Sequence, residues 1–197
     1  VAFVIAGAWV AGTFNPNDYT VQQIEDEFHK KEMRIIEELG LKIGVDVEIA
    51  YCPERFNPGD PAHGVRQVAR VIGCSNPEVG AALVSLYSKL TTEDVRYVGK
   101  MEVAEAAKVI ENVQRDINIA LVNELARILP ALDVDVEDVL SAAATKWNFH
   151  RYTPGVGVGG HCIPVDPYYM IQRASDMGVS AGLITAARNV NRSMPIH

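Results

Sequence analysis

The sequence is poor in three features, and each shortage excludes a class of protein. Only three cysteines occur in 197 residues, Cys52, Cys74 and Cys162, and their spacing suits neither a disulfide framework nor a paired-cysteine metal site. Acidic residues outnumber basic ones, and the net charge of -7 argues against a nucleic-acid-binding protein. No apolar run reaches the roughly 18 residues of a membrane-spanning helix, and the apolar start lacks the basic flank of a signal peptide. We expect a cytoplasmic protein that binds neither nucleic acid nor membrane.

The first hundred residues alternate short apolar segments with polar turns, which predicts a layered α/β unit. Strands are predicted at residues 1–12, 45–52 and 65–74. The second predicted strand ends in the loop PERFNPGDPAHG, which is rich in proline and glycine. Ligands of open α/β sheets bind at the carboxyl ends of the strands. The loop after residue 52 is therefore a candidate binding region.

Helical patterns lie between and after these strands. Residues 21–39 have apolar side chains at helical spacings and end at Gly40 as a C-cap, while residues 76–90 begin with Asn76 as N-cap. Residues 102–129 contain neither glycine nor proline, which predicts one long helix. Its second half is apolar on most sides, so we expect it to be buried inside a domain or against another subunit. Further helices are predicted at residues 136–147, 167–177 and 182–194.

The stretch TPGVGVGGHCIPVDPYYM, residues 153–170, concentrates glycine and proline around one cysteine. Its four glycines remove most Cβ atoms, so a ligand can approach the main chain closely. Asp166 followed by Pro167 predicts an N-cap and a helix start, where the helix dipole favours a thiolate at Cys162. The alternatives are that Cys162 is a small buried apolar residue and that Asp166 is only an N-cap.

The other cysteines and His161 are predicted to have no chemical role. Cys52 and Cys74 are expected to be inert core residues. His161 has no second ligand residue at a suitable spacing, so no metal site is predicted. A cysteine hydrolase that pairs Cys162 with His161 is disfavoured, because adjacent residues rarely have the mutual geometry of nucleophile and base.

Polar residues at helical spacing occur inside the predicted long helix. Lys108, Asn112 and Arg115 are four and then three residues apart, so all three are expected on one face. This face is either a solvated polar stripe or a pair of donors, Lys108 and Asn112, for a developing oxyanion. Glu54 and Arg55, in the loop after the second strand, are either an exposed ion pair or polar groups that converge on the same cleft.

Five stretches together resemble the nucleotide-sugar dehydrogenase family, the UDP-glucose and UDP-N-acetylhexosamine 6-dehydrogenases. They are AYCPERFNPGD at 50–60, VARVIG at 68–73, EAAKVIENVQRDINIALVNELA at 105–126, FHRYTPGVGVGGHCIPVDPYYM at 149–170 and AARNVNRSMP at 186–195.

The resemblance implies a role for each candidate residue. Cys162 matches the nucleophile that captures the C6 aldehyde of a UDP-sugar as a thiohemiacetal, which is then oxidised to a thioester. Lys108 and Asn112 match the pair that stabilises the oxyanion. Asp166 matches the carboxylate that activates the hydrolytic water, and Glu54 matches an active-site glutamate. The implied substrate-binding residues are Arg55, Phe149, Tyr152, Gly157, Gly159 and Gly160.

The resemblance also implies the architecture and the partners. Residues 1–100 are expected to be a truncated Rossmann-like portion with a parallel sheet, and residues 101–197 a mostly helical central domain that carries the cysteine loop. The implied cofactor is NAD, and the implied assembly is a homodimer formed through the helix at 102–129. HCIPVDPYY is similar to the N-acetylhexosamine branch, which serves polysaccharide biosynthesis; UDP-N-acetylmannosamine is favoured over UDP-N-acetylglucosamine and UDP-glucose.

The sequence departs from the family pattern near its start. GAWVAG at 7–12 is the only candidate for the glycine-rich NAD loop, and Trp9 stands where a glycine would let the pyrophosphate approach. Residues 1–27 match the family poorly, and Cys74 stands where relatives often have glycine. We expect the chain to be part of a longer polypeptide. The alternative function is a non-catalytic dimerisation core that cannot bind NAD.

Overall fold

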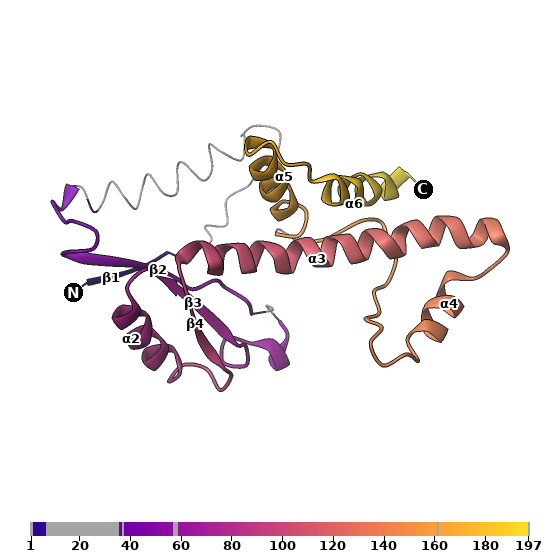
Figure 1. Cartoon of the computed structure of the whole chain (residues 1–197). Helices are drawn as coiled ribbons and strands as arrows, with labels where there is room; N and C mark the ends of the chain where they lie inside the picture. The colour runs from indigo at the N-terminus through magenta and orange to yellow at the C-terminus, as the bar shows by residue number, and fades with distance from the viewer. Residues whose placement is uncertain (1, 7–35, 37, 57–58, 161, 197) are drawn as a thin grey trace. The chain divides into compact units, whose positions relative to one another are not determined.

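The computed structural model describes residues 2–6, 36, 38–56, 59–160 and 162–196 (Figure 1). The chain divides into two compact units, Val1–Lys108 and Val109–His197. The boundary falls inside α3 (Met101–Ile128), so this helix begins in the first unit and ends in the second. It coincides with the long helix predicted at 102–129 to within one residue at each end.

The first unit is built on a four-stranded sheet with the strand order β1-β2-β3-β4. The strands are β1 (Ala2–Ala6), β2 (Val47–Tyr51), β3 (Arg70–Cys74) and β4 (Val95–Gly99). β1 is parallel to β2 and β3 is parallel to β4, whereas β2 and β3 are antiparallel. The predicted α/β fold with one long helix is confirmed.

The expectation of a sheet that is parallel throughout is corrected at the β2–β3 pair. A parallel pair needs a crossover connection, usually through a helix. The connection from β2 to β3 contains only a short 3-10 turn, Pro61–His63, among its described residues. The chain therefore returns in the opposite direction, and β3 begins at Arg70 rather than at the predicted residue 65.

A βαβ unit completes this half of the molecule. β3, α2 (Pro77–Tyr87) and β4 follow one another, and the two strands pair in parallel. The side chain of Asn76 accepts hydrogen bonds from the backbone N–H groups of Glu78 and Val79, at 3.0 and 3.3 Å. The predicted N-cap is thus confirmed. β4 was not predicted from the sequence, because five residues with Arg96 among them give a weak strand pattern.

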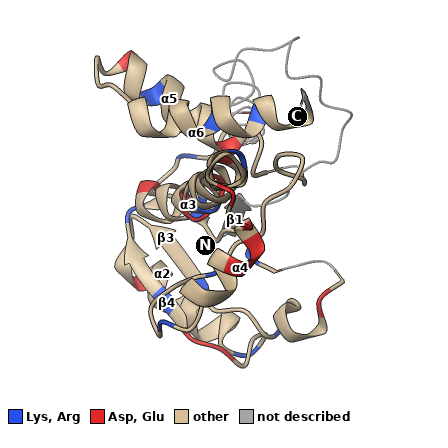
Figure 2. Ribbon diagram, turned by 90° about the vertical axis from the view of Figure 1, so that its right-hand side faces the viewer, with Lys and Arg blue, Asp and Glu red and all other residues tan. Residues whose placement is uncertain are grey.

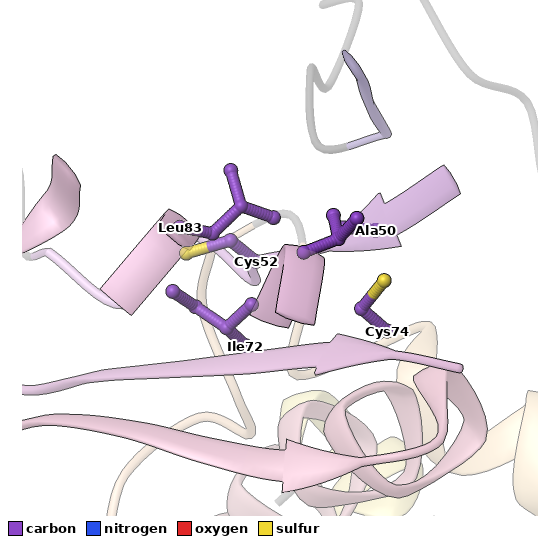
Figure 3. Close-up of a cluster of buried hydrophobic side chains, with 6 residues drawn as sticks. Ala50, Cys52, Ile72, Cys74 and Leu83 are labelled. Atoms are coloured by element: carbon purple, nitrogen blue, oxygen red, sulfur yellow. The ribbon is translucent and has the colours of Figure 1, made fainter. Parts of the chain in front are cut away.

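The core of the first unit is apolar and contains two of the three cysteines. Cys52 and Cys74 pack with the buried residues Ala50, Ile72, Val79 and Leu83 (Figure 3). Their predicted place in the core is confirmed. Burial raises the pKa of the Cys52 thiol above its ordinary value of 9.0, and the guanidinium of Arg70 opposes this rise only in part. Cys52 is therefore protonated at neutral pH.

The second unit consists of the end of α3 and three further helices. They are α4 (Val136–Ala143), α5 (Asp166–Asp176) and α6 (Gly182–Ser193), with 3-10 turns at Leu129–Leu132 and Met194–Ile196. α5 and α6 lie along the same side of α3 (Figure 1). The helices predicted at 167–177 and 182–194 are confirmed to within one residue at each end, whereas α4 ends before the predicted residue 147.

Most of the predicted helix at 21–39 and the predicted strand beyond residue 6 lie outside the described residues. The end of that helix is described. Gly40 has a φ of 67°, and the N–H of Leu41 donates to the carbonyl of Ile36 at 3.0 Å. This is the hydrogen bond of a glycine C-cap, as predicted. None of the helices in the described ranges is long and apolar enough to cross a membrane.

Candidate functional site

A buried pair of polar side chains joins α3 to α5. The Nδ2 of Asn112 donates a hydrogen bond to Oδ2 of Asp166 at 2.5 Å. The two residues are 54 positions apart in the sequence, and their exposed fractions are only 6% and 3%. A buried carboxylate is costly unless a donor compensates it, so this hydrogen bond holds Asp166 in one orientation.

Asp166 has a different structural role from the predicted one. The N-cap of α5 is Val165, which makes no side-chain capping hydrogen bond, and Asp166 is the first residue of the helix. The prediction of Asp166 as N-cap is therefore wrong. The carboxylate instead accepts a hydrogen bond from Asn112 of α3.

Cys162 lies one turn before Asp166 and is tied to it through the main chain. Its carbonyl accepts the N–H groups of Val165 and Asp166, at 3.0 and 2.8 Å. The residue is half-buried, in contrast to Cys52 and Cys74, and all three cysteines are outside disulfides. The one cysteine that is not buried in the core therefore lies on the turn that leads into α5, four residues before the buried Asp166. That arrangement suits a thiolate nucleophile with an adjacent general base.

The glycine-rich segment before Cys162 presents main chain with few side chains over it. Gly157 and Gly160 have φ values of 119° and 88°, which L side chains rarely adopt. A Cβ atom at Gly155, Gly159 or Gly160 would have no heavy atom within 4 Å. The main chain is open at these three positions, as a segment that binds a ligand through its backbone requires. Their role in substrate binding stays a prediction.

A polar face of α3 was missed in the sequence. Besides Asn112, the completely buried residues Asp116 and Asn123 lie on this face, four and eleven positions further along the helix. Arg115, which was predicted to share the face of Asn112, is exposed. The signal was present in the sequence. Asp116 directly precedes the apolar run INIALVNELARIL, and Asn123 lies inside it, seven residues later, which is a helical spacing.

Asp116 and Asn123 form hydrogen bonds with side chains of α6. The charged side chains of α6 are Arg188 and Arg192 (blue in Figure 2). Nη1 of Arg188 donates to Oδ1 of Asp116 at 2.5 Å, and both side chains are buried. Nδ2 of Asn191 donates to the same carboxylate oxygen at 2.8 Å. The buried charge of Asp116 is thus compensated by an opposite charge and by a second donor.

The remaining candidates are placed in different parts of the chain. Glu54, Arg55 and Lys108 belong to the first unit, and each is half-buried. Oε1 of Glu54 is buried without a hydrogen-bond partner among the described residues. In the second unit Phe149 is exposed and Tyr152 is half-buried. The catalytic and substrate-binding roles of all these residues stay predictions.

NAD and a metal ion each require a particular arrangement of strands or side chains. Open α/β sheets bind dinucleotides at the point where the strand order reverses. The order β1-β2-β3-β4 runs in one direction, so the described strands contain no such point. The candidate loop at 7–12 lies outside the described residues. The described residues do not by themselves form a dinucleotide site, and no three of their His, Cys, Asp or Glu side chains gather as a metal site.

Two domain models of one family match the chain. The central domain of the UDP-glucose/GDP-mannose dehydrogenase family matches residues 102–193, and the NAD binding domain of the same family matches residues 18–91. The two matches together include every described candidate residue.

Proteins with curated names and solved structures are also similar to the chain. The UDP-N-acetyl-D-glucosamine 6-dehydrogenase of Pseudomonas aeruginosa is 48% identical over 79% of this chain and 36% of that protein. The UDP-N-acetyl-D-mannosamine dehydrogenase of Pyrococcus horikoshii is 36% identical over 84% of this chain and 39% of that protein. A solved structure of the Pyrococcus horikoshii UDP-D-ManNAc dehydrogenase superposes with a TM-score of 0.75, at 36% identity, over 85% of this chain and 39% of that one. The chain therefore spans well under half the length of these relatives.

Proposed function

Because the chain belongs to the UDP-glucose/GDP-mannose dehydrogenase family, we propose that it is part of an enzyme that oxidises the C6 alcohol of a UDP-N-acetylhexosamine to a carboxylate. Two molecules of NAD, the cofactor that the family's domain model names, would accept one hydride each, the first on conversion of the alcohol to the aldehyde and the second on conversion to the thioester. The observation that carries the proposal is the 2.5 Å hydrogen bond from Asn112 to Asp166, the residue whose N–H donates to the carbonyl of the half-buried Cys162. Together these three residues supply a nucleophile, an oriented carboxylate and an amide donor.

The first part of the proposed chemistry forms a bond to sulfur. The Cys162 thiolate adds to the C6 aldehyde, a C–S bond forms, and the carbonyl oxygen gains the negative charge. Donors placed where that charge develops stabilise it most, and Lys108 and Asn112 are proposed as those donors. Asn112 lies one helical turn after Lys108 on α3, so both side chains project from one side of the helix. Loss of the second hydride from C6 then leaves a thioester on Cys162.

The second part of the proposed chemistry breaks the bond to sulfur. Asp166 takes a proton from water, the resulting hydroxide attacks the thioester carbonyl, and the Cys162 thiolate leaves. A general base must be held in position relative to the water and the carbonyl carbon. The buried hydrogen bond from Asn112 supports this role, because it fixes the carboxylate one helical turn from the cysteine.

The identity of the sugar is a separate question. The sequence pattern around Cys162 favoured UDP-N-acetylmannosamine. The Pseudomonas aeruginosa relative, at 48% identity, is named for UDP-N-acetyl-D-glucosamine, whereas the Pyrococcus horikoshii relative, at 36%, is named for UDP-N-acetyl-D-mannosamine. We therefore propose a UDP-N-acetylhexosamine substrate and rank the gluco epimer first.

The test is NADH formation by the protein with UDP-N-acetylglucosamine and, separately, UDP-N-acetylmannosamine, with the uronate product identified by mass spectrometry. We expect turnover with one epimer at least. Cys162→Ser should abolish carboxylate formation, and Lys108→Ala should lower the rate by about 10²-fold or more. Cys74→Ala is the matched control, because it removes a buried core thiol of the first unit. Full turnover by Cys162→Ser would overturn the proposal.

A second candidate, a non-catalytic core that does not bind NAD, is favoured by one observation. The described strands lack the reversal of order at which open sheets bind dinucleotides. Fluorescence titration with NADH separates the two candidates. Saturable binding supports the dehydrogenase, and an absence of binding at millimolar NADH supports the non-catalytic core.

We also propose that α3 pairs two copies of the chain. Ile110, Leu121 and Ile128 are about half exposed and lie on one face of this helix, eleven and seven positions apart. An apolar stripe of this kind on a long helix is typical of a helix that packs against a partner. Leu121→Glu should convert a dimer to a monomer in analytical ultracentrifugation, whereas Arg115→Glu, at an exposed position of the same helix away from the apolar stripe, should not.

A further inference from the structure

The glycine-rich segment is tied to α3 by one buried side chain. The N–H of Gly155 donates to Oδ1 of Asn123 at 2.8 Å. Gly155 is exposed, whereas Asn123 has no exposed surface. A surface segment that is joined to a completely buried amide has its position set from the interior of the unit.

The orientation of Asn123 is itself determined by its neighbours. Its Nδ2 donates to Oδ1 of Asn191 at 2.9 Å, and Nδ2 of Asn191 donates to the carbonyl and to Oδ1 of Asp116, at 3.0 and 2.8 Å. Each amide thus uses its oxygen as acceptor and its nitrogen as donor. A rotation of the Asn123 amide by half a turn would present a donor to the N–H of Gly155, so only one orientation satisfies all partners.

Asn191 contacts the segment at a second point, through its main chain. Gly157 has a φ of 119°, and a Cβ atom there would lie 3.0 Å from the carbonyl oxygen of Asn191. Only glycine combines this backbone conformation with so close an approach. The segment is therefore hydrogen-bonded to α3 at Gly155 and lies close against α6 at Gly157.

The same polar cluster reaches the helix that begins after Cys162. The guanidinium carbon of Arg188, whose Nη1 binds Asp116, lies 5.4 Å from the ring centroid of Tyr168. Tyr168 is in the first turn of α5, two residues after Asp166. A guanidinium over an aromatic face at this distance is attractive. The cluster thereby contacts the chain both before and after Cys162.

We propose that Asn123 and Asn191 are positioning residues, which hold the glycine-rich segment and through it set the place of the Cys162 thiol at the start of α5. This inference rests on the proposed function for its biological purpose. The property that Asn123 and Asn191 would control is the reactivity of the Cys162 thiol, which is measurable without turnover. Neither asparagine is assigned a contact with the substrate.

The first test compares two substitutions of nearly equal size. Asn123→Leu removes the acceptor for the Gly155 N–H, and Asn123→Asp keeps an oxygen there. Labelling of Cys162 by iodoacetamide is followed by mass spectrometry across the pH range. We expect Asn123→Leu to slow labelling at neutral pH about tenfold and to move its pH profile to higher pH, since the thiol leaves the helix start. Asn123→Asp should stay within about twofold of the unaltered protein.

A second pair of variants is available if Asn123→Leu does not fold. Gly155→Pro removes the N–H donor at an exposed position, whereas Gly155→Ala keeps it and adds a Cβ in open space. We expect Gly155→Pro to reproduce the slower labelling of Cys162 and Gly155→Ala to label at the normal rate.

Labelling of the buried Cys52 and Cys74 is the internal control for unfolding. A general loss of structure would accelerate labelling at all three cysteines, whereas a loss of positioning slows Cys162 alone. Unchanged or faster labelling of Cys162 in Gly155→Pro, with Cys52 and Cys74 still protected, overturns the inference, and so does the same result in Asn123→Leu. Slower labelling of Cys162 alone supports the inference, even in a protein that forms no NADH. A failure of the positioning inference is therefore distinguishable from a failure of the proposed function.

Discussion

The two units of the chain have interiors of opposite chemistry. The buried cluster of the first unit consists of apolar side chains and two cysteines, among them Ile72, Cys74 and Leu83. Among the described residues of the second unit, six buried side chains are polar or charged, and two of them form the ion pair of Asp116 and Arg188. The apolar interior stabilises a sheet and a helix, whereas the polar interior fixes the orientation of particular atoms.

The α3 helix shows the same contrast within one element. Its buried face in the second unit carries Asn112, Asp116 and Asn123, and the roughly opposite face exposes Ile110 and Leu121. An ordinary surface helix has the reverse pattern. Buried polar groups are directional and apolar contacts are not, so burial in the second unit fixes the orientation of these side chains.

The largest expected effect is loss of the buried ion pair. Asp116→Ala should lower the free energy of unfolding by about 3 to 5 kcal/mol, because Arg188 is left as an uncompensated buried charge. Urea unfolding followed by circular dichroism measures this change. Glu124→Ala, at an exposed position of the same helix, should stay within about 0.5 kcal/mol of the unaltered protein. Equal effects of the two substitutions would remove the contrast between the interiors.

Truncation in the apolar core of the first unit is expected to have the next largest effect. Leu83 is 2% exposed, and Leu83→Ala should cost about 3 kcal/mol through lost burial and the cavity that remains. Leu86→Ala, on the half-exposed side of the same helix, is the control and should cost much less. Leu83→Met should cost less than about 1.5 kcal/mol, since an apolar interior tolerates a change of shape at constant volume. A larger loss of unfolding free energy in Leu83→Met would show that the apolar core depends on the shape of each side chain as strongly as the polar interior depends on its orientation.

The cap of α2 gives a smaller effect. Asn76→Ala removes the acceptor for the N–H groups of Glu78 and Val79 and should cost about 1 kcal/mol in the free energy of unfolding. Asn76→Asp keeps the acceptor and is the matched control. Identical losses for the two variants would show that the cap does not stabilise the helix.

The smallest expected effect is a dependence of stability on alkaline pH. The pKa of Cys52 is raised by burial above 9.0, so the folded state holds this proton more tightly than the unfolded chain does. The resulting stabilisation is present below the ordinary thiol pKa and is lost as the pH rises through the folded value. Cys52→Val should flatten the fall in unfolding free energy between about pH 8 and pH 10. The same dependence of unfolding free energy on pH in both proteins would contradict the assignment to Cys52. Burial also raises the pKa of Tyr87, which accounts for any dependence that remains in Cys52→Val.

The features that are local in sequence were the ones predicted correctly. The absence of glycine and proline gave the limits of α3, and Asn76 and Gly40 gave the ends of two helices. The contact of Asp166 with Asn112 joins residues 54 positions apart, so nothing near Asp166 distinguished it from an N-cap. The reversal of direction between β2 and β3 was likewise missed, since it depends on how the connecting loop folds back.

The candidate site was predicted in part for the same reason. The glycines and Cys162 form a continuous stretch, so their association was evident in the sequence. The polar cluster that holds this stretch comes from α3 and α6, and its members Asp116 and Asn191 are 75 positions apart. Their partnership follows only from the packing of the helices.

The proposed role of Cys162 in chemistry on a sugar nucleotide is tested most directly by a time course of iodoacetamide labelling, resolved by site with mass spectrometry, with and without UDP-N-acetylglucosamine. We expect Cys162 to be labelled at least about tenfold faster than Cys52 and Cys74, and the sugar nucleotide to slow its labelling alone. Equal labelling of the three cysteines, or a rate at Cys162 that the sugar nucleotide leaves unchanged, would contradict the account.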